Sequence, residues 1–363
     1  MPPAFPFELD YKPKFGNKID YGIAFIGTGG VVQYGHIPAY KKAGFNLVGC
    51  YDLNFETAQK VAAEHGIPHI YQTLDDLLAA PEVEVVDIAV PPWEQLNVVT
   101  KVAAAGKHML CQKPLSTNFA DAVRIVELGK QAGVKQAINH QMRWDAGIRA
   151  SKHLIEQGII GEPTDVQIQV NCLTPWHMWP WLAAEPHLEV MFHSIHYLDA
   201  MRYLFGDPEW VTSRHARYLK QGDVKGETKT VTVMDYASGL QGLVAVNHYN
   251  AWADPFAFFR FIGTEGAITG TIGLMNNYPN AEPDTIEITS SHYGKGVKIT
   301  PTLDDLWIPD AFVGTMASLL EAIENDHTPI DNSTEDNLNT LRVIFATYLS
   351  AAENRSVRPS GVT

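Results

Sequence analysis

A glycine-rich segment near the N-terminus has the spacing of a phosphate-binding turn: Gly27, Thr28, Gly29, Gly30, Val31 and Val32. Gly27 permits a tight turn, and Gly29 lets the backbone approach a pyrophosphate at the N-terminus of the following helix. The third position of this pattern usually holds Gly or Ala so that helix and strand pack closely, whereas this chain has Val32. The segment predicts a dinucleotide site only if a strand precedes it and a helix follows it.

An acidic residue stands where such a site needs one. Asp52 ends the next apolar run, 25 residues after Gly27. A carboxylate about 20 residues beyond the turn accepts hydrogen bonds from the ribose hydroxyls. It also repels the 2′-phosphate of NADP, and Leu53 and Asn54 follow it rather than Arg or Lys, so the sequence favours NAD. The competing interpretation makes Asp52 a helix N-cap.

A lysine follows a later apolar run. Residues 108–111 read as a strand that leads into Gln112, Lys113 and Pro114. In an open parallel sheet ligands gather at the carboxyl ends of the strands, so Lys113 is expected to face them. The competing interpretation is a solvated surface lysine.

Two histidines share one face of a predicted helix over residues 188–202. His193 and His196 are three residues apart, Glu189 lies four residues before His193, and Asp199 lies three residues after His196. Such a pair could hold a metal ion, but no third ligand set is evident, and we expect no metal. Proton transfer is the other chemistry that these side chains support.

An aromatic segment follows the first strand of the second half of the chain. Residues 174–181 contain Trp176, His177, Trp179 and Trp181. Indole faces stack on the apolar faces of sugar rings, which predicts a sugar-binding wall. An ordinary hydrophobic loop or an oligomer contact is the alternative. The same two interpretations apply to a second cluster: Asn247, His248, Tyr249 and Trp252.

Regular alternation of strands and helices positions the N-terminal residues. We expect strands at 23–27, 47–52, 85–90, 108–111 and 135–139, separated by helices at 33–44, 55–65, 94–105 and 118–132, with Asn118 as an N-cap. This order predicts a doubly wound parallel sheet. Arg143 and Trp144 follow its last strand and are candidates to line a site.

After about residue 160 the pattern changes. Strands are expected at 164–172, 228–235, 242–249 and 256–262, with helices near 187–204, 312–324 and 337–352. We therefore expect an antiparallel or mixed sheet in a second, α+β domain. The predicted boundaries are an N-terminal extension at 1–18, a cofactor domain at 19–143 and a substrate and oligomerisation domain at 144–363.

Composition narrows the class of protein. The 363 residues are 45% apolar and 19% charged, as in globular proteins. With 27 basic and 41 acidic residues the formal charge is 27 − 41 = −14, which disfavours nucleic-acid and anionic membrane partners. Three cysteines without CxxC spacing, no signal-peptide pattern and no apolar run of about 18 residues predict a cytoplasmic protein.

Taken together, these motifs resemble the glucose–fructose oxidoreductase / inositol dehydrogenase / MocA (Gfo/Idh/MocA) family. The resemblance covers nearly the whole chain. The segments that carry it are Gly27-Thr28-Gly29, Asp52, Ala89-Val90-Pro91, Gly106-Lys107-His108, Lys113-Pro114, 139–143, 161–163, 196–199 and 350–357. It implies a Rossmann domain followed by an α+β domain with an open-faced sheet.

The resemblance also implies roles for single residues. Lys113 would contact the substrate and the nicotinamide ribose, and His196 would be the catalytic histidine with Asp199 as the second of two family aspartates. The chain departs from the family at Gln112, where Glu is usual, at Gln95, where many members have His, and at Phe192, where the first aspartate is usual. His193, one position beyond Phe192, is a possible replacement.

The function expected from these observations is NAD-dependent oxidation of a hydroxyl on a sugar or cyclic polyol, with the anomeric hydroxyl of an aldose favoured. The alternatives are ketone formation as in inositol dehydrogenases, an NAD-dependent glycosidase, or a non-catalytic protein that senses NAD or sugar. An exposed sheet face predicts a homodimer or homotetramer. The expected cofactor-binding residues are Gly27, Thr28, Gly29, Gly30, Val31, Val32, Asp52, Val90, Pro91, Gln95, Gln112 and Lys113. The expected substrate-binding residues are Lys113, Arg143, Trp176, His177, Phe192, His193 and His196.

Overall fold

The computed structural model describes residues 8–250, 255–276 and 281–362, and the chain forms two compact units. The parallel-sheet unit consists of residues 13–144 and 308–338. The mixed-sheet unit consists of residues 145–307 and 339–363, together with the N-terminal segment that ends at Lys12. Residues 308–338 thus belong to the compact unit of the parallel sheet, although they lie far beyond it in the sequence.

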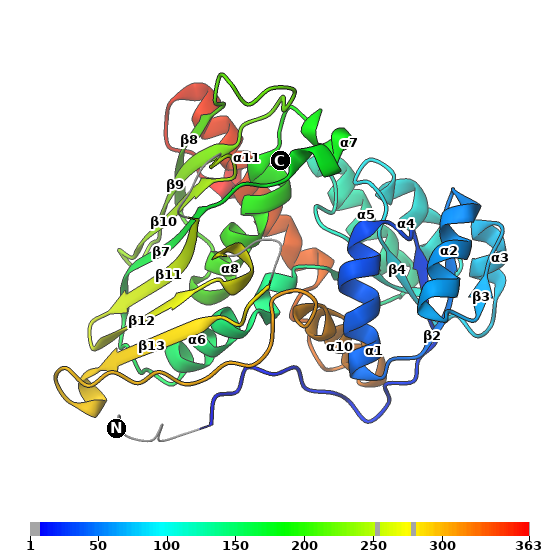
Figure 1. The fold of residues 1–363 in the computed structure, drawn as a ribbon, viewed down its shortest axis with the longest axis horizontal. Coiled ribbons are helices and arrows are strands. Elements are labelled where there is room, and N and C mark those ends of the chain that lie inside the picture. The colour runs from blue at the N-terminus through cyan, green and yellow to red at the C-terminus, as the bar shows by residue number, and fades with distance from the viewer. Residues whose placement is uncertain (1–7, 251–254, 277–280, 363) are drawn as a thin grey trace. The chain divides into compact units, whose positions relative to one another are not determined.

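Six parallel strands form the sheet of the first unit, in the order β3-β2-β1-β4-β5-β6 (Figure 1). The strands are β1 (Ile23–Ile26), β2 (Leu47–Tyr51), β3 (His69–Ile70), β4 (Val85–Ile88), β5 (His108–Cys111) and β6 (Gln136–Ile138). The helices are α1 (Ile37–Ala43), α2 (Phe55–His65), α3 (Leu74–Ala79), α4 (Gln95–Ala104), α5 (Phe119–Ala132) and α10 (Ala311–Glu324). Every residue of β1 and β4 is buried, which is why both read as unbroken apolar runs apart from Asp87.

The predicted doubly wound domain is therefore confirmed. All five strands expected before residue 140 are present, and the Asn118 side chain caps α5 by accepting a hydrogen bond from the amide of Asp121. The sequence analysis missed β3 and α3, because a strand of two residues has no period to detect. The helix expected from Gln33 begins with one π turn, Val32–His36, before α1.

Seven strands form the sheet of the second unit, in the order β13-β12-β11-β7-β10-β9-β8 (Figure 1). They are β7 (Pro163–Asn171), β8 (Trp210–Ala216), β9 (Lys229–Asp235), β10 (Gln241–Asn247), β11 (Phe256–Gly263), β12 (Gly266–Thr271) and β13 (Thr285–Ser290). Only the pairing of β10 with β7 is parallel. The predicted mixed sheet is confirmed, but β8, β12 and β13 were not foreseen, since glycine in β12 and charged side chains in β8 mask their alternation.

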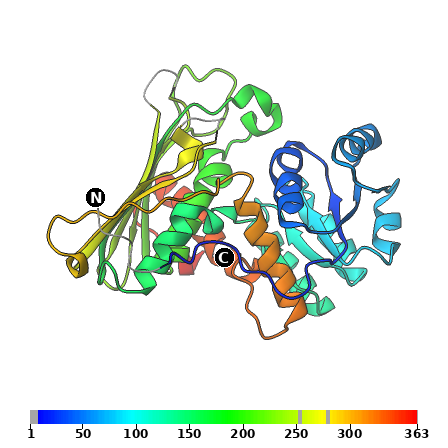
Figure 2. The ribbon, with the colours of Figure 1, turned by 60° about the horizontal axis from the view of Figure 1, so that its bottom comes forward.

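Helices of the second unit cover one face of this sheet (Figures 1 and 2). They are α6 (Ala146–Glu156), α8 (Ile195–Phe205) and α11 (Thr334–Glu353), and the short helices α7 (Pro180–Ala183) and α9 (Gly273–Asn276) lie at the sheet ends. Along β7 the side chains of Val166, Ile168 and Val170 are buried, whereas Gln167 and Gln169 between them are partly exposed. This period of two identifies one covered face and one open face.

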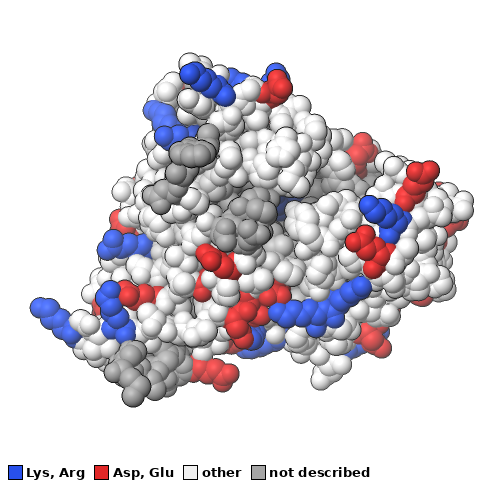
Figure 3. Space-filling view, in the orientation of Figure 1, with Lys and Arg blue, Asp and Glu red and all other residues white. Residues whose placement is uncertain are grey.

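Charged side chains are dispersed over the face of the molecule that Figure 3 shows. On the face shown in Figure 3, the described Lys and Arg residues are interspersed with Asp and Glu rather than gathered into one basic area. In the part of the chain that the structure describes, no helix has the length and apolar character required to cross a bilayer.

Candidate active site

The glycine turn leaves β1 in the geometry that its sequence predicts. Gly27 has φ +90°, and a Cβ added there would lie 2.5 Å from the carbonyl oxygen of Ala89, so both the conformation and the space require glycine. At Gly29, by contrast, an added Cβ would meet nothing within 4 Å. Among the described residues no contact requires glycine at this position, and the exposed backbone of Gly29 leaves an open space, here called the Gly29 cradle, that a side chain would enter.

The helix that follows packs differently from the helix in the common dinucleotide-binding pattern. Val32, where Gly or Ala was expected, is fully buried. The close approach occurs instead at Gly35, where an added Cβ would lie 2.6 Å from the ring of Phe312 in α10. The amides of Val32 and Gln33 point toward the carbonyl of Gly29, at 3.1 and 3.2 Å, so helical geometry begins directly after the exposed glycines.

Asp52 is not the N-cap of α2. Asn54 has that role, since its side chain accepts from the amide of Thr57. Asp52 instead accepts from the amide and hydroxyl of Thr28 at 2.8 and 3.0 Å, and from the amide of Asn54 at 2.9 Å. These bonds hold the partly exposed carboxylate beside the glycine turn, and each oxygen retains capacity to accept from a ribose hydroxyl.

The ends of β4 and β5 contribute the remaining residues of this edge. Val90 is partly exposed and Pro91 is exposed after β4. Gln95 is 1% exposed, and its Nε2 donates to the carbonyl oxygens of Gln112 and Pro114, each at 2.7 Å. Gln95 therefore braces the turn after β5, and its buried Oε1 has no hydrogen-bond partner among the described residues.

Lys113 lies in that braced turn. Its amide donates to the Oε1 atom of Gln112 at 2.7 Å, and the Lys113–Pro114 peptide bond is cis. Burial lowers the pKa of Lys113 to about 8, because a desolvated ammonium is disfavoured. The side chain can therefore hold or release a proton near neutral pH.

These residues fit a dinucleotide. The open cradle at Gly29, the start of a helix behind it and the Asp52 carboxylate are the groups that a pyrophosphate and a ribose require. Gly29, Gly30 and Val31 would hold the pyrophosphate and Asp52 the ribose, and the unpartnered Gln95 oxygen offers an acceptor.

The histidines lie on a helix of the mixed-sheet unit. One π turn, Val190–Ser194, leads directly into α8. His196 is 7% exposed, with its ring edge-on to Trp307 at a centroid distance of 5.4 Å. His193 is partly exposed, and its ring lies 4.6 Å from that of His248. At position 192 the chain has Phe instead of the aspartate that is usual in the family, and the Phe192 ring is buried against Trp181.

Neighbouring protein groups hold the charged side chains of Asp199, Arg202 and Arg143. Asp199 accepts from the hydroxyl of Thr340 at 2.5 Å, and Arg202 donates to Asp207 at 2.5 Å. Arg143, a predicted substrate residue, is 3% exposed and donates to the carbonyl of Asp331 and the carboxylate of Asp336. Its guanidinium fastens the segment before α11 to the end of β6.

The aromatic segment divides into a buried and an exposed part. Trp176 is 5% exposed, and its Nε1 donates to the carbonyl of His248 at 3.3 Å, so its indole is part of the packing. His177 and Trp181 are exposed. Tyr249 is partly exposed, and Trp252, from the second predicted cluster, lies outside the described residues.

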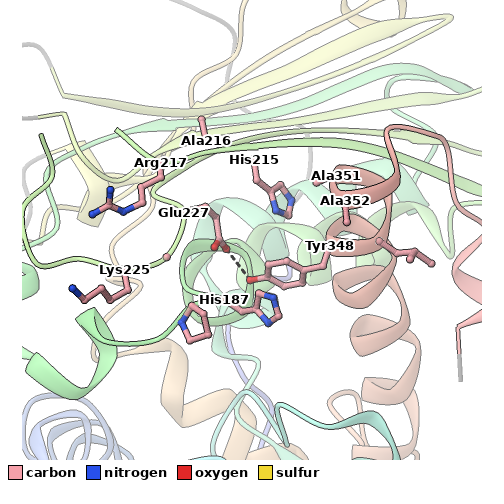
Figure 4. Close-up of a pocket in the computed structure, with 12 residues that line it drawn as sticks. His187, His215, Ala216, Arg217, Lys225, Glu227, Tyr348, Ala351 and Ala352 are labelled. Atoms are coloured by element: carbon pink, nitrogen blue, oxygen red, sulfur yellow. Dashed lines mark hydrogen bonds between the residues drawn. The ribbon is translucent and has the colours of Figure 1, made fainter. Parts of the chain in front are cut away.

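Two buried acids anchor the histidine-bearing helix. Glu227 accepts from the amides of Leu188 and Val190 at the start of this helix, and from the Tyr348 hydroxyl of α11 at 2.7 Å. Figure 4 shows Glu227, Tyr348, His187 and His215 facing one another in a pocket of about 610 Å³. Each of these hydrogen bonds joins Glu227 either to the start of the histidine-bearing helix or to α11. We therefore assign Glu227 a structural role, in which it holds that helix in place.

The second acid, Glu189, accepts from the hydroxyls of Ser194 and Thr230. Burial raises its pKa to about 8. Burial also lowers the pKa of His248 to about 3, so that ring is neutral beside His193. Among the described residues, no three His, Cys, Asp or Glu side chains are grouped so as to hold a metal ion.

Comparison with known protein families matches both halves of the chain. Residues 21–140 match the oxidoreductase family with an NAD-binding Rossmann fold, and residues 148–269 match the Gfo/Idh/MocA C-terminal domain. The chain belongs to the Gfo/Idh/MocA family. It is therefore an NAD(P)-dependent oxidoreductase whose first domain binds NAD, as the sequence motifs predicted.

Relatives of this Gfo/Idh/MocA protein include two characterised enzymes. It is 27% identical over 345 residues to D-apiose dehydrogenase from Paraburkholderia graminis, covering 92% of this chain and 88% of that protein. It is 27% identical over 253 residues to 1,5-anhydro-D-fructose reductase from Ensifer adhaerens, covering 68% of this chain and 74% of that protein.

Solved structures share the fold. An oxidoreductase from Agrobacterium radiobacter in complex with NAD+, L-tartaric acid and magnesium has a TM-score of 0.82 at 23% identity, over 94% of this chain and 99% of that one. Levoglucosan dehydrogenase in complex with NADH and levoglucosan has a TM-score of 0.78 at 19% identity, over 93% and 99%.

A pair of glycine variants separates a glycine needed by the ligand from one needed by the fold. Gly29→Ala should leave the free energy of unfolding within about 0.5 kcal/mol of the parent, since the new methyl group meets nothing. It should weaken NAD binding by at least about tenfold, or about 1.4 kcal/mol. Gly27→Ala, the matched control, should unfold at lower urea concentration because φ is positive and Ala89 is too close.

The measurements are urea unfolding and titration calorimetry with NAD. If Gly29→Ala binds NAD as tightly as the parent, the pyrophosphate does not lie on this cradle.

Proposed function

We propose that this Gfo/Idh/MocA protein uses NAD to oxidise a hydroxyl group of a sugar or cyclic polyol, with the anomeric hydroxyl of an aldose preferred and a lactone as product. Two relatives named for sugar chemistry, D-apiose dehydrogenase and 1,5-anhydro-D-fructose reductase, support this substrate class. The observation that carries the proposal is Lys113, a lysine of lowered pKa held in a braced turn at the carboxyl edge of an NAD-binding sheet.

Oxidation of an alcohol removes two hydrogens as different species. The C–H hydrogen leaves as a hydride, which NAD accepts when bound, and the O–H hydrogen leaves as a proton. The protein must accept that proton and stabilise the negative charge that develops on oxygen.

Lys113 is proposed as the group that stabilises the oxygen. A protonated Lys113 places a positive charge in a partly desolvated turn, where its attraction for a developing alkoxide is stronger than in water. Its neighbour in the sequence, Gln112, is neutral and adds no negative charge to this turn.

His196 is proposed as the proton acceptor. It is the one described histidine of α8, and the anchoring by Glu227 and the contact with Trp307 restrict its movement. Phe192 is not ionisable, so position 192 adds no carboxylate to the turn that precedes His196.

Substitutions at these two residues distinguish their roles. His196→Ala should lower the chemical rate by about 10²–10⁴-fold, with normal folding and unchanged NAD affinity. Its deficit relative to the parent at the same pH should shrink as pH rises, because hydroxide replaces the missing base. Lys113→Ala should weaken substrate and cofactor binding and should show no such recovery.

Lys113→Arg is the matched control, since arginine keeps its charge at all pH values used. If Lys113 acts as a cation, the parental rate falls as pH rises through about 8, and Lys113→Arg retains activity without that fall. If the parental rate instead rises through pH 8 and Lys113→Arg is inactive, Lys113 is the base. A loss of the chemical step in His193→Ala, with His196→Ala near parental, moves the proton acceptor to His193.

We also propose that the open face of the mixed sheet pairs with a second copy of the chain. This face carries apolar side chains, with Val231 40% exposed and Phe256 39% exposed, and Phe256 stacks on Phe258 at 5.8 Å. Leu243 and Ile262 share the same register face. Exposed apolar side chains gathered on one sheet face, here with Gln167 and Gln169 among them, are typical of a surface that another protein covers.

Light scattering at micromolar concentration should give the mass of a homodimer or homotetramer of the 40.2 kDa chain. Val231→Lys, placed on the open face, should shift the population toward monomer, whereas Thr232→Val on the covered face should not. A parental monomer would contradict this assembly.

A further inference from the structure

A fully buried imidazole lies beneath the Lys113 turn, in the parallel-sheet unit. His36 and Asp87 are both 0% exposed, and the Nδ1 atom of His36 lies 2.8 Å from the Oδ2 atom of Asp87. The Tyr40 hydroxyl donates to the same carboxylate oxygen at 2.6 Å. The π turn Val32–His36 ends at His36 and α1 begins at the next residue, which brings His36 and Tyr40 to one acid on β4.

The other nitrogen of His36 faces two side-chain amides. The Nε2 atoms of His36 and Gln112 lie 3.1 Å apart, and the Nδ2 atom of Asn139 lies 3.1 Å from the same ring nitrogen. The contact with Lys113 identifies which end of the Gln112 amide carries the oxygen. The backbone N–H of Lys113 can only donate, so the oxygen of Gln112 faces Lys113 at 2.7 Å and its NH2 group faces His36.

These contacts determine the protonation of His36. An NH2 group donates only to a nitrogen with a free lone pair, so Nε2 carries no proton. The one ring proton is then on Nδ1, which donates it to Asp87. The imidazole is neutral, and its two nitrogens connect an acid on β4 to the amide that orients the Lys113 backbone.

We propose that His36 is a positioning residue for Lys113: Asp87 fixes its tautomer, and its Nε2 lone pair fixes the direction of the Gln112 amide, which in turn holds the backbone of Lys113. The catalytic consequence rests on the proposed function of Lys113. The arrangement requires a neutral residue at position 112, because a carboxylate there would face the lone pair of His36.

Gln112→Glu is the decisive substitution. The carboxylate that it introduces keeps one oxygen to accept from Lys113, but its second oxygen must accept from His36 rather than donate to it. His36 then binds a second proton and becomes an imidazolium between two carboxylates. The other titratable groups that face this cluster are Tyr40 and Cys111, and burial beside Asp87 raises the pKa of both.

Gln136→Glu is a matched control in the same unit. Gln136 is buried, its side chain donates to the carbonyl of Ile125 and to the sulfur of Met109 and accepts from Thr334, and none of these bonds reaches the His36 cluster. Both substitutions replace a hydrogen-bonded side-chain amide with a carboxyl group, so a general loss of stability should appear in both.

Nitrogen-15 NMR of histidine-labelled protein reads the tautomer without any substrate, with His36 identified by loss of its signal in His36→Gln. We expect the parent to show His36 protonated on Nδ1 only. Gln112→Glu should show a doubly protonated His36 that loses a proton as pH rises. Gln136→Glu should show the parental His36 signals.

The pH profile of turnover adds the second readout. In Gln112→Glu, kcat should fall by about 10- to 100-fold as His36 loses that proton. In the parent and in Gln136→Glu, the pH profile of kcat should show no fall that accompanies proton loss from His36. A parental His36 protonated on Nε2, or a Gln112→Glu protein with parental His36 signals, would overturn the proposal. The expected tautomers without sugar oxidation would instead refute only the proposed function, since the NMR result stands alone.

Discussion

The amide of Gln112 can point in only one direction, and the candidate site is built around that constraint. One end must accept from the backbone of Lys113, and the other must donate to a buried imidazole whose remaining nitrogen already serves Asp87. With the amide reversed, its NH2 group would face the backbone N–H of Lys113, and its oxygen would face the lone pair of the fully buried His36 ring. Asp87 lies on strand β4, and the Lys113 turn follows strand β5. His36 is the last residue of the π turn before α1. Lys113 thereby projects from a backbone whose supporting groups lie within the packing of the sheet.

Neutral side chains at two positions give this member of the family its electrostatic character. Gln112 and Phe192 stand where the family resemblance leads one to expect acids. With no carboxylate at position 112, that residue does not offset the desolvation that lowers the pKa of Lys113. With Phe192 buried against Trp181, no acid at that position favours a protonated His196. Gln112 makes hydrogen bonds and Phe192 packs against Trp181, whereas acids at these two positions would add negative charge.

The sequence was most informative where local rules decide the structure. Gly27, Gly29 and the buried strands were predictable because turn geometry and burial leave few residue types possible. It was least informative where tertiary packing decides. The role of Gly35 depends on Phe312, far away in the sequence, and the π turns have no periodic signature. Arg143 and Trp176 carry suitable chemistry, but partners distant in the sequence hold them within the packing. Asp87, an acid inside an apolar strand, was the one available signal for the His36 cluster.

Transfer of deuterium from a C1-deuterated aldose to NAD shows whether this protein oxidises the anomeric carbon, because it follows the hydrogen itself. Purified protein is mixed with NAD and aldoses labelled at C1, and NADH and the sugar product are analysed by mass spectrometry. The account predicts NADH that carries one deuterium per lactone formed, at a rate slower than with unlabelled sugar. Unlabelled NADH would place the oxidation at another carbon. Unchanged sugar, or released sugar without accumulated NADH, would contradict net oxidation by this protein.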